Sequence, residues 1–140
     1  MNEPKPLNWK PGPGVGMTVE RRVDGGMNLT FSDLSDATLK AWREFALEHL
    51  LGADRRTRNR YDLRAVKEIN EAAVRKAVEV NSDPSARNIR LAVVVASEQV
   101  AEAIRTIAAL ALPETAAAVK IFSDLDEAEN WLARPLDQIP

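Results

Sequence analysis

Arginine is concentrated in one short stretch of this chain, RRTRNRYDLR at positions 55–64, which holds five arginines in ten residues. Guanidinium groups bind phosphate oxygens and Tyr61 could stack on a base, so a phosphate or nucleic-acid contact is one interpretation of the stretch. The other interpretation is a solvated loop followed by a strand whose outer side is charged. The formal net charge is -2 and only 5% of the residues are aromatic. This composition favours the second interpretation, and we expect no nucleic-acid partner.

The residues from which catalytic and metal sites are usually built are scarce. There is no cysteine, which excludes thiolate catalysis and disulfides, and His49 is the only histidine, which excludes a site with several histidines. The acidic pattern Asp124-x-Asp126-Glu127 lacks the glycine and the ligand spacing of an EF-hand, and helix capping explains it better. We therefore predict no catalytic residue, no metal and no cofactor, and a protein that is not an enzyme.

The N-terminal segment is rich in proline and glycine and has no hydrophobic period, which predicts an extended arm over 1–16 with Trp9 as its only large apolar side chain. Its GPGVG (12–16) resembles a phosphate-binding loop only superficially, because such a loop follows a strand and opens a helix. No apolar run has the length of a signal peptide core or a membrane span. We expect a soluble, cytoplasmic protein without a membrane partner.

Two hydrophobic periods divide the rest of the chain into strands and helices. MTVERRV (17–23) and MNLTF (27–31) alternate around Asp24-Gly25-Gly26, which predicts a β-hairpin. Helical spacing begins after residue 35, and further strands and helices then follow in turn. We predict strands at 58–66, 89–96 and 119–122, and helices from 35 to a stop at Gly52, over 69–80, over 100–111 and from about 125 to 133.

The resulting element order is β-β-α-β-α-β-α-β-α. Strands separated by helices of this length pair in parallel through right-handed crossovers, and the hairpin adds one antiparallel strand. The predicted fold class is α/β. We expect a single domain over 17–134 with a mixed, mostly parallel sheet of about five strands, followed by a C-terminal tail over 135–140.

The tetrapeptide FSDL occurs twice, at 31–34 and 122–125, and each copy lies where a predicted strand ends and a helix begins. Ser and Asp side chains accept hydrogen bonds from the free N–H groups of a helix's first turn. We predict Ser35 as the N-cap of the first helix, while Ser123 and Asp124 are both suitable caps for the last one. The repeat is a strand-to-helix junction used twice.

Alternation along the strands places charged side chains on one face of the sheet. Burying such charges beneath helices costs several kcal/mol each unless they are paired, so we expect helices to cover one face fully and the other only partly. The partly covered face, around an apolar patch at Ala92 and Val94, would suit a homodimer or a protein partner. A solvated face of ion-paired arginines is the alternative. The predicted interaction face consists of Arg58, Arg60, Asp62, Arg64 and Arg90.

A second candidate region follows from the topology. In open α/β sheets, ligands bind beyond the C-terminal ends of the strands, where helix N-termini direct free N–H groups outward. The predicted strand-end rim includes Arg64, Lys67, Asn70, Ser97 and Ser123.

Over residues 17–133 the chain resembles the STAS superfamily of anti-sigma-factor antagonists, and more closely its SpoIIAA-like relatives of uncharacterised function. The resemblance rests on the element order, on YDLRAV (61–66), on LAVVVAS (91–97) and on FSDLDEAENWL (122–132). In regulatory members of the family, a phosphorylatable Ser or Thr opens the helix after the central strand. The corresponding VKEINE (66–71) has no hydroxyl group and departs from that pattern.

The resemblance implies a cytosolic, bacterial-type regulatory module that binds proteins and has no phosphorylation switch. Together with the arginine face, it predicts a non-enzymatic interaction domain that self-associates as a homodimer. The alternative is a small-molecule or lipid-binding protein that holds a small apolar ligand between helices and sheet, in a pocket near Trp42, Phe45 and Trp131.

Overall fold

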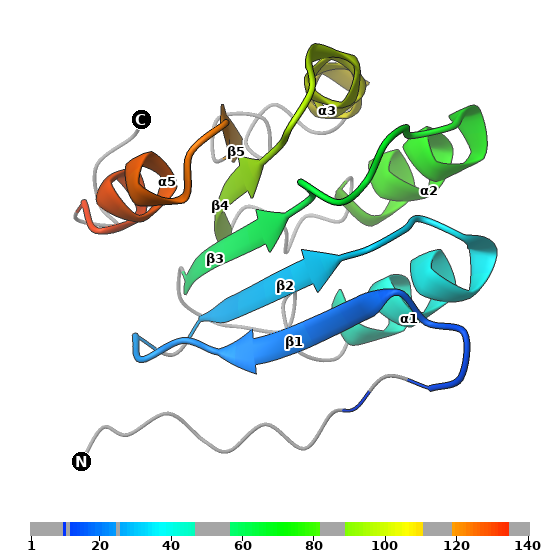
Figure 1. Cartoon of the computed structure of the whole chain (residues 1–140), viewed down its shortest axis with the longest axis horizontal. Helices are drawn as coiled ribbons and strands as arrows, with labels where there is room; N and C mark the ends of the chain where they lie inside the picture. The colour runs from blue at the N-terminus through cyan, green and yellow to red at the C-terminus, as the bar shows by residue number, and fades with distance from the viewer. Residues whose placement is uncertain are drawn as a thin grey trace.

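The structure is a computed structural model, and the residues that it describes are 10, 12–24, 26–46, 57–81, 89–110 and 119–134. Within them, strands and helices follow in the predicted order, and the predicted α/β class is confirmed (Figure 1). The elements are β1 Met17–Arg21, β2 Met27–Phe31, α1 Asp36–Phe45, β3 Thr57–Asp62, α2 Glu71–Asn81, β4 Ile89–Val94, α3 Glu98–Leu110, β5 Val119–Phe122 and α5 Leu125–Leu132.

The five strands form one sheet in the order β1-β2-β3-β4-β5. β1 and β2 pair in antiparallel fashion as the predicted hairpin, and every other neighbouring pair is parallel. The register aligns apolar side chains in a row that crosses the whole sheet, which is what alternation with period two produces when one face is buried. The row is Val19, Leu29, Tyr61, Val93 and Ile121.

Helices α1, α2 and α3 cover the face that carries this row, and α5 lies on the opposite face (Figure 1). The helical stripe predicted for α1 is buried there at Leu39, Trp42 and Phe45. Trp42 donates a hydrogen bond from Nε1 to the hydroxyl oxygen of Tyr61 over 3.0 Å. The main core therefore joins the first helix to the centre of the sheet.

The opposite face has a smaller core of its own. Ala128, Trp131 and Leu132 of α5 are buried against Ala92 and Val94 of β4. α5 contacts β3, β4 and β5, so the outer face of the hairpin stays open and its side chains are exposed at Thr18, Glu20 and Thr30. Helices thus cover one face of the sheet broadly and the other only in part.

The helices begin at capping residues that the sequence indicated, whereas the hydrophobic period of one strand continues beyond the strand itself. Ser35 is the N-cap of α1, as predicted, and accepts a hydrogen bond from the N–H of Thr38. At the last helix, where the sequence left two choices, the N-cap is Asp124, which accepts from the N–H of Asp126 over 2.8 Å. β3 ends at Asp62, four residues earlier than predicted.

Several predicted features lie outside the described residues. They are Trp9, Gly25, His49, Gly52 and the tail over 135–140. Most of the predicted N-terminal arm lies there too, so these domain boundaries stay predictions. No helix in the described ranges is both long and apolar enough to cross a membrane.

Candidate functional site

The loops that follow β2, β3, β4 and β5 meet at one edge of the sheet, because these four strands run in parallel (Figure 1). This edge is the predicted strand-end rim. Two of its residues cap a helix with a side-chain oxygen. Asn70 Oδ1 accepts from the N–H of Ala73 over 2.8 Å, and Ser97 Oγ accepts from the N–H of Val100 over 3.2 Å. Both residues are exposed.

The other rim residues are directed outward. Lys67 and Ser123 are exposed. The sequence had placed Arg64 both on the sheet face and at the rim, and because β3 stops at Asp62 it belongs to the rim. Arg64 binds the Asp62 carboxylate through Nε and Nη2, at 3.0 and 2.9 Å. These hydrogen bonds hold the pKa of Asp62 below its ordinary value, since they and the charge of Arg64 outweigh the partial burial of the carboxylate.

On the sheet face beneath α5, the arginines have partners within the same chain. Glu129 of α5 accepts hydrogen bonds from Arg22 at 2.7 and 2.9 Å and from Arg60 at 2.6 Å. The hydrogen bonds of Arg22 lower the pKa of Glu129, and the charges of Arg22 and Arg60 lower it further, although burial acts in the opposite direction. This cluster, which we call the Glu129 cluster, ties the hairpin loop and β3 to α5.

Two further arginines bind the C-terminal end of α5. Arg58 donates to the carbonyl oxygens of Leu132 and Arg134, at 2.6 and 3.2 Å, and Arg90 donates to the Arg134 carbonyl over 2.8 Å. A cation is favourable there because the last carbonyls of a helix carry partial negative charge. The guanidinium of Arg90 also lies 5.4 Å from the centre of the Trp131 ring.

The predicted interaction face is therefore only partly available to another molecule. Arg90 is 2% exposed and Asp62 is 9% exposed, so α5 and neighbouring side chains cover them. Arg58 and Arg60 are partly exposed and Arg64 is exposed. That these three residues contact a partner stays a prediction.

Sequence reasoning missed Glu129, and it left Arg22 out of the predicted interaction face although strand alternation had placed Arg22 on the charged side. A signal was present for Glu129, because it borders the apolar stripe of α5, one turn after Leu125. An acid beside such a stripe indicates a cation on the facing element. For Arg22 the signal was strand alternation, but its partner could not be predicted, because Arg22 follows the last residue of β1 and lies 107 residues from Glu129 in sequence.

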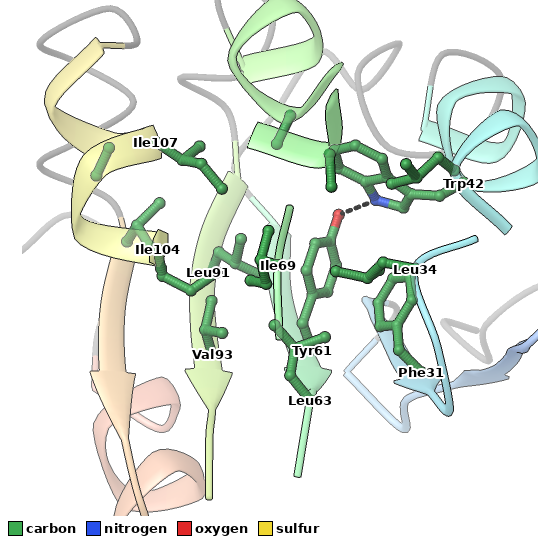
Figure 2. A pocket seen from close by; sticks show the side chains of 15 residues that line it. Phe31, Leu34, Trp42, Tyr61, Leu63, Ile69, Leu91, Val93, Ile104 and Ile107 are labelled. Atoms are coloured by element: carbon green, nitrogen blue, oxygen red, sulfur yellow. Dashed lines mark hydrogen bonds between the residues drawn. The ribbon is translucent and has the colours of Figure 1, made fainter. Parts of the chain in front are cut away.

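An apolar cavity of about 70 Å³ lies between the sheet and the three helices that cover its main face (Figure 2). Trp42 lines it, as the sequence predicted, but Phe45 does not, and Trp131 lies on the other side of the sheet. The predicted grouping of these three aromatic residues was wrong. Strand parity alone could not tell on which face the last helix packs.

No metal site is evident in the part of the chain that the structure describes, where no three His, Cys, Asp or Glu side chains come together in a suitable group.

Comparison with known proteins shows the fold and no more. No protein-family model matches the chain, and no curated protein sequence matches it at a meaningful level. The crystal structure of an anti-sigma factor antagonist from Mycobacterium paratuberculosis superposes with a TM-score of 0.58, at 18% sequence identity, over 84% of this chain and 93% of that one. This chain has the anti-sigma factor antagonist fold.

The resemblance inferred from the element order is thus confirmed at the level of the fold. Within the anti-sigma factor antagonist fold, the loop from β3 to α2 is the segment that the resemblance associates with phosphorylation. Here it spans 63–70, contains no Ser or Thr, and ends in the capping residue Asn70.

Proposed function

We propose that this chain is a non-enzymatic regulatory module of a bacterial cytoplasm that binds another protein through its strand-end rim, without a phosphorylation switch. The anti-sigma factor antagonist fold supports the proposal, because the matched Mycobacterium paratuberculosis protein is described as an antagonist of an anti-sigma factor. That description names a protein as the target. The low identity supplies no target for this chain, so the partner's identity is left to experiment.

The observation that carries the proposal is the position of Asn70. It is exposed and caps α2 at the site where the resemblance places a phosphorylatable hydroxyl group. An amide caps a helix about as well as a hydroxyl does, but it cannot be phosphorylated. The start of α2 would therefore present a single charge state. Arg64, Lys67 and Glu68 lie exposed in the same loop and supply charged groups for recognition.

Site-specific photo-crosslinking in the native host cells tests where a partner docks. A benzophenone amino acid at Lys67 or at Ser123 samples the rim, and the same amino acid at Leu110 is the matched control. Leu110 is 62% exposed at the far end of α3. We expect one protein to be captured from both rim positions and not from the control. Equal capture from all three positions, or capture from none, contradicts the proposal.

The partner obtained in this way permits a sharper test at Asn70. Both Asn70→Asp and Asn70→Ser keep a capping oxygen and hence the start of α2, but only Asn70→Asp adds a negative charge. We expect Asn70→Asp to weaken binding about tenfold or more, measured by calorimetry, because a charge is then desolvated at the interface. Asn70→Ser should bind like the unmodified chain. Equal affinity for all three proteins would remove Asn70 from the interface.

Self-association stays a prediction within this proposal. The arginine face is only partly available for it, because α5 supplies partners for Arg60 and covers Arg90. The part of that face which α5 leaves open is the outer side of β1 and β2, with Thr18, Glu20 and Thr30 exposed. A second copy would dock there, beside α5.

A further inference from the structure

The cavity beneath the main helical layer differs from the rim in its chemistry. Its lining comes from the sheet on one side, with Tyr61, Leu91 and Val93, and from α1, α2 and α3 on the other, with Trp42, Ala77 and Ile107 among the contributors (Figure 2). One water needs about 10–15 Å³ on this measure. A cavity of about 70 Å³ therefore has room for a small molecule.

The side chains that line the cavity are hydrocarbon with two polar exceptions, the Tyr61 hydroxyl and the Trp42 indole N–H. The indole N–H is satisfied, since it donates to the Tyr61 oxygen over 3.0 Å. The hydroxyl proton of Tyr61 has no acceptor among the described residues. Tyr61 is only 8% exposed, so solvent does not readily supply an acceptor.

Tyr61 remains a hydrogen-bond donor throughout the neutral range. Burial raises the pKa of its hydroxyl to about 12, although the hydrogen bond from Trp42 acts in the opposite direction. A buried donor without an acceptor is destabilising. The cavity thus combines apolar space with one hydroxyl group that stays protonated at neutral pH and whose proton has no acceptor among the described residues.

Water is a poor match for this combination. A buried water molecule is held by two to four polar groups, and the described lining offers little besides the Tyr61 hydroxyl. A molecule that is mostly hydrocarbon would bury its surface against the lining, while a single oxygen would satisfy the hydroxyl proton. A charged ligand is disfavoured, because no charged side chain lines the cavity to compensate for the loss of hydration.

We propose that this cavity binds a small neutral molecule of about six non-hydrogen atoms, mostly hydrocarbon, whose one carbonyl oxygen accepts a hydrogen bond from the Tyr61 hydroxyl. A short ketone, ester or lactone has this chemistry. The proposal does not depend on protein binding at the rim, because the Tyr61 hydroxyl and the cavity beside it lie between the sheet and the helices. Either can fail without the other.

Two probes of matched shape test the proposal on the full chain labelled with ¹⁵N. Cyclopentanone carries the acceptor, and methylenecyclopentane replaces its oxygen by a CH₂ group. We expect both to shift the indole N–H signal of Trp42, with cyclopentanone binding about three- to tenfold more tightly, as one neutral hydrogen bond allows. The indole signal of Trp131, on the other side of the sheet, should not move and serves as an internal control.

Three variants separate the contributions of space and hydrogen bonding. Tyr61→Phe keeps the ring and removes the hydroxyl, so the two probes should bind equally. Ala77→Leu fills the cavity from a partly buried position and should abolish binding of both. Ala72→Leu adds the same side chain at an exposed position of the same helix and should change nothing.

The proposal is overturned if neither probe shifts the Trp42 signal up to its solubility limit. It is equally overturned if the two probes bind alike in the unmodified chain, or if the preference for cyclopentanone survives in Tyr61→Phe. Should Tyr61→Phe fail to fold, the comparison of Ala77→Leu with Ala72→Leu and the preference between the two probes still decide the question.

Discussion

At the scale of single residues, two positions permit little substitution, one because another part of the backbone lies against it and one because two arginines bind it. Gly26 ends the hairpin loop and lies against the backbone of β3. A Cβ at Gly26 would overlap the carbonyl oxygen of Arg58, and a backbone obstacle cannot rotate away as a flexible side chain can. The contact explains why glycine is required there independently of any turn conformation. Glu129 is the second such residue, since two guanidinium groups depend on it.

Gly26→Ala should lower the free energy of unfolding by about 3 kcal/mol, the upper end of the range for overpacked sites, because the hairpin must separate from β3 to make room. Gly12→Ala is the control, since a Cβ at Gly12 would meet no atom within 4 Å. Its effect should stay within about 0.5 kcal/mol. Denaturant unfolding of the two variants measures the difference, and equal stability would show that the loop adapts freely.

Glu129→Gln should lower the free energy of unfolding at pH 7 by about 1–2 kcal/mol, between the values typical of exposed and of buried ion pairs. The side chain of Arg22 is only 10% exposed and would lose its charged partner on α5. Glu20→Gln, at an exposed position of β1, is the matched control and should have little effect. Similar losses in both variants would argue that the Glu129 cluster contributes nothing.

The same cluster makes stability depend on pH in a defined direction. The pKa of Glu129 lies below its ordinary value of 4.5 in the folded state. Its contribution is therefore complete above about pH 4.5 and is lost as the pH falls through the folded pKa. We expect thermal stability to decrease below pH 4.5, and to decrease less in Glu129→Gln. Some dependence should persist, because the pKa values of Asp33 and Asp62 are lowered as well.

At the scale of elements, α5 is a short helix that closes a second core. Its buried residues face only β4 and its neighbours, whereas α1, α2 and α3 share one larger core. Arginines from β3, β4 and the hairpin loop hold both its side and its C-terminal end. Apolar contacts and arginine contacts thus both hold this eight-residue helix. The arginines of the charged sheet face bind α5 and the residues that follow it.

Leu132→Ala should destabilise the chain by about 2–5 kcal/mol, as expected for the loss of a fully buried leucine. Leu132 is 0% exposed in the core beneath α5, whereas Leu110 at the end of α3 is 62% exposed. Leu110→Ala should therefore change stability by less than about 0.5 kcal/mol. Calorimetric unfolding compares them, and a Leu132→Ala effect as small as that of the control would mean that α5 is dispensable.

At the scale of the whole molecule, the two faces of the sheet differ in how far helices cover them. The main face is buried under three helices and contains the cavity, while the other is divided between α5 and an open polar surface on the hairpin. The four helix starts lie along the rim, at the edge where the parallel strands end (Figure 1). A protein partner, a small ligand and a second copy would therefore use three separate regions.

Self-association through the open hairpin face should appear as a dimer whose population grows with concentration in sedimentation velocity. Thr30→Arg places a charge at the centre of that face and should raise the dissociation constant at least about tenfold, because like charges meet across a twofold axis. Ala72→Arg, on the exposed side of α2, should leave it unchanged. A single monomeric species at every concentration would contradict the homodimer prediction.

Much of the fold could be predicted because its determinants are local. Alternation and helical spacing identified the elements in order, and the serine at position 35 identified a helix start. Boundaries were less accurate where apolar residues continue beyond a strand, as Leu63 and Val66 do after β3. The rim was predictable as well, since parallel strands must end at a common edge. Which of its residues bind a partner is not a local property.

The sequence by itself determined the element order, the mixed, mostly parallel sheet and the absence of a cysteine or multi-histidine site, because periodicity, capping and composition act within short segments. Only the tertiary structure decided that Glu129 receives Arg22 and Arg60, that Arg90 is covered, and that Trp42 and Trp131 lie on opposite faces. These facts depend on the face against which α5 packs. Packing joins residues up to 107 positions apart, and no local pattern encodes that choice.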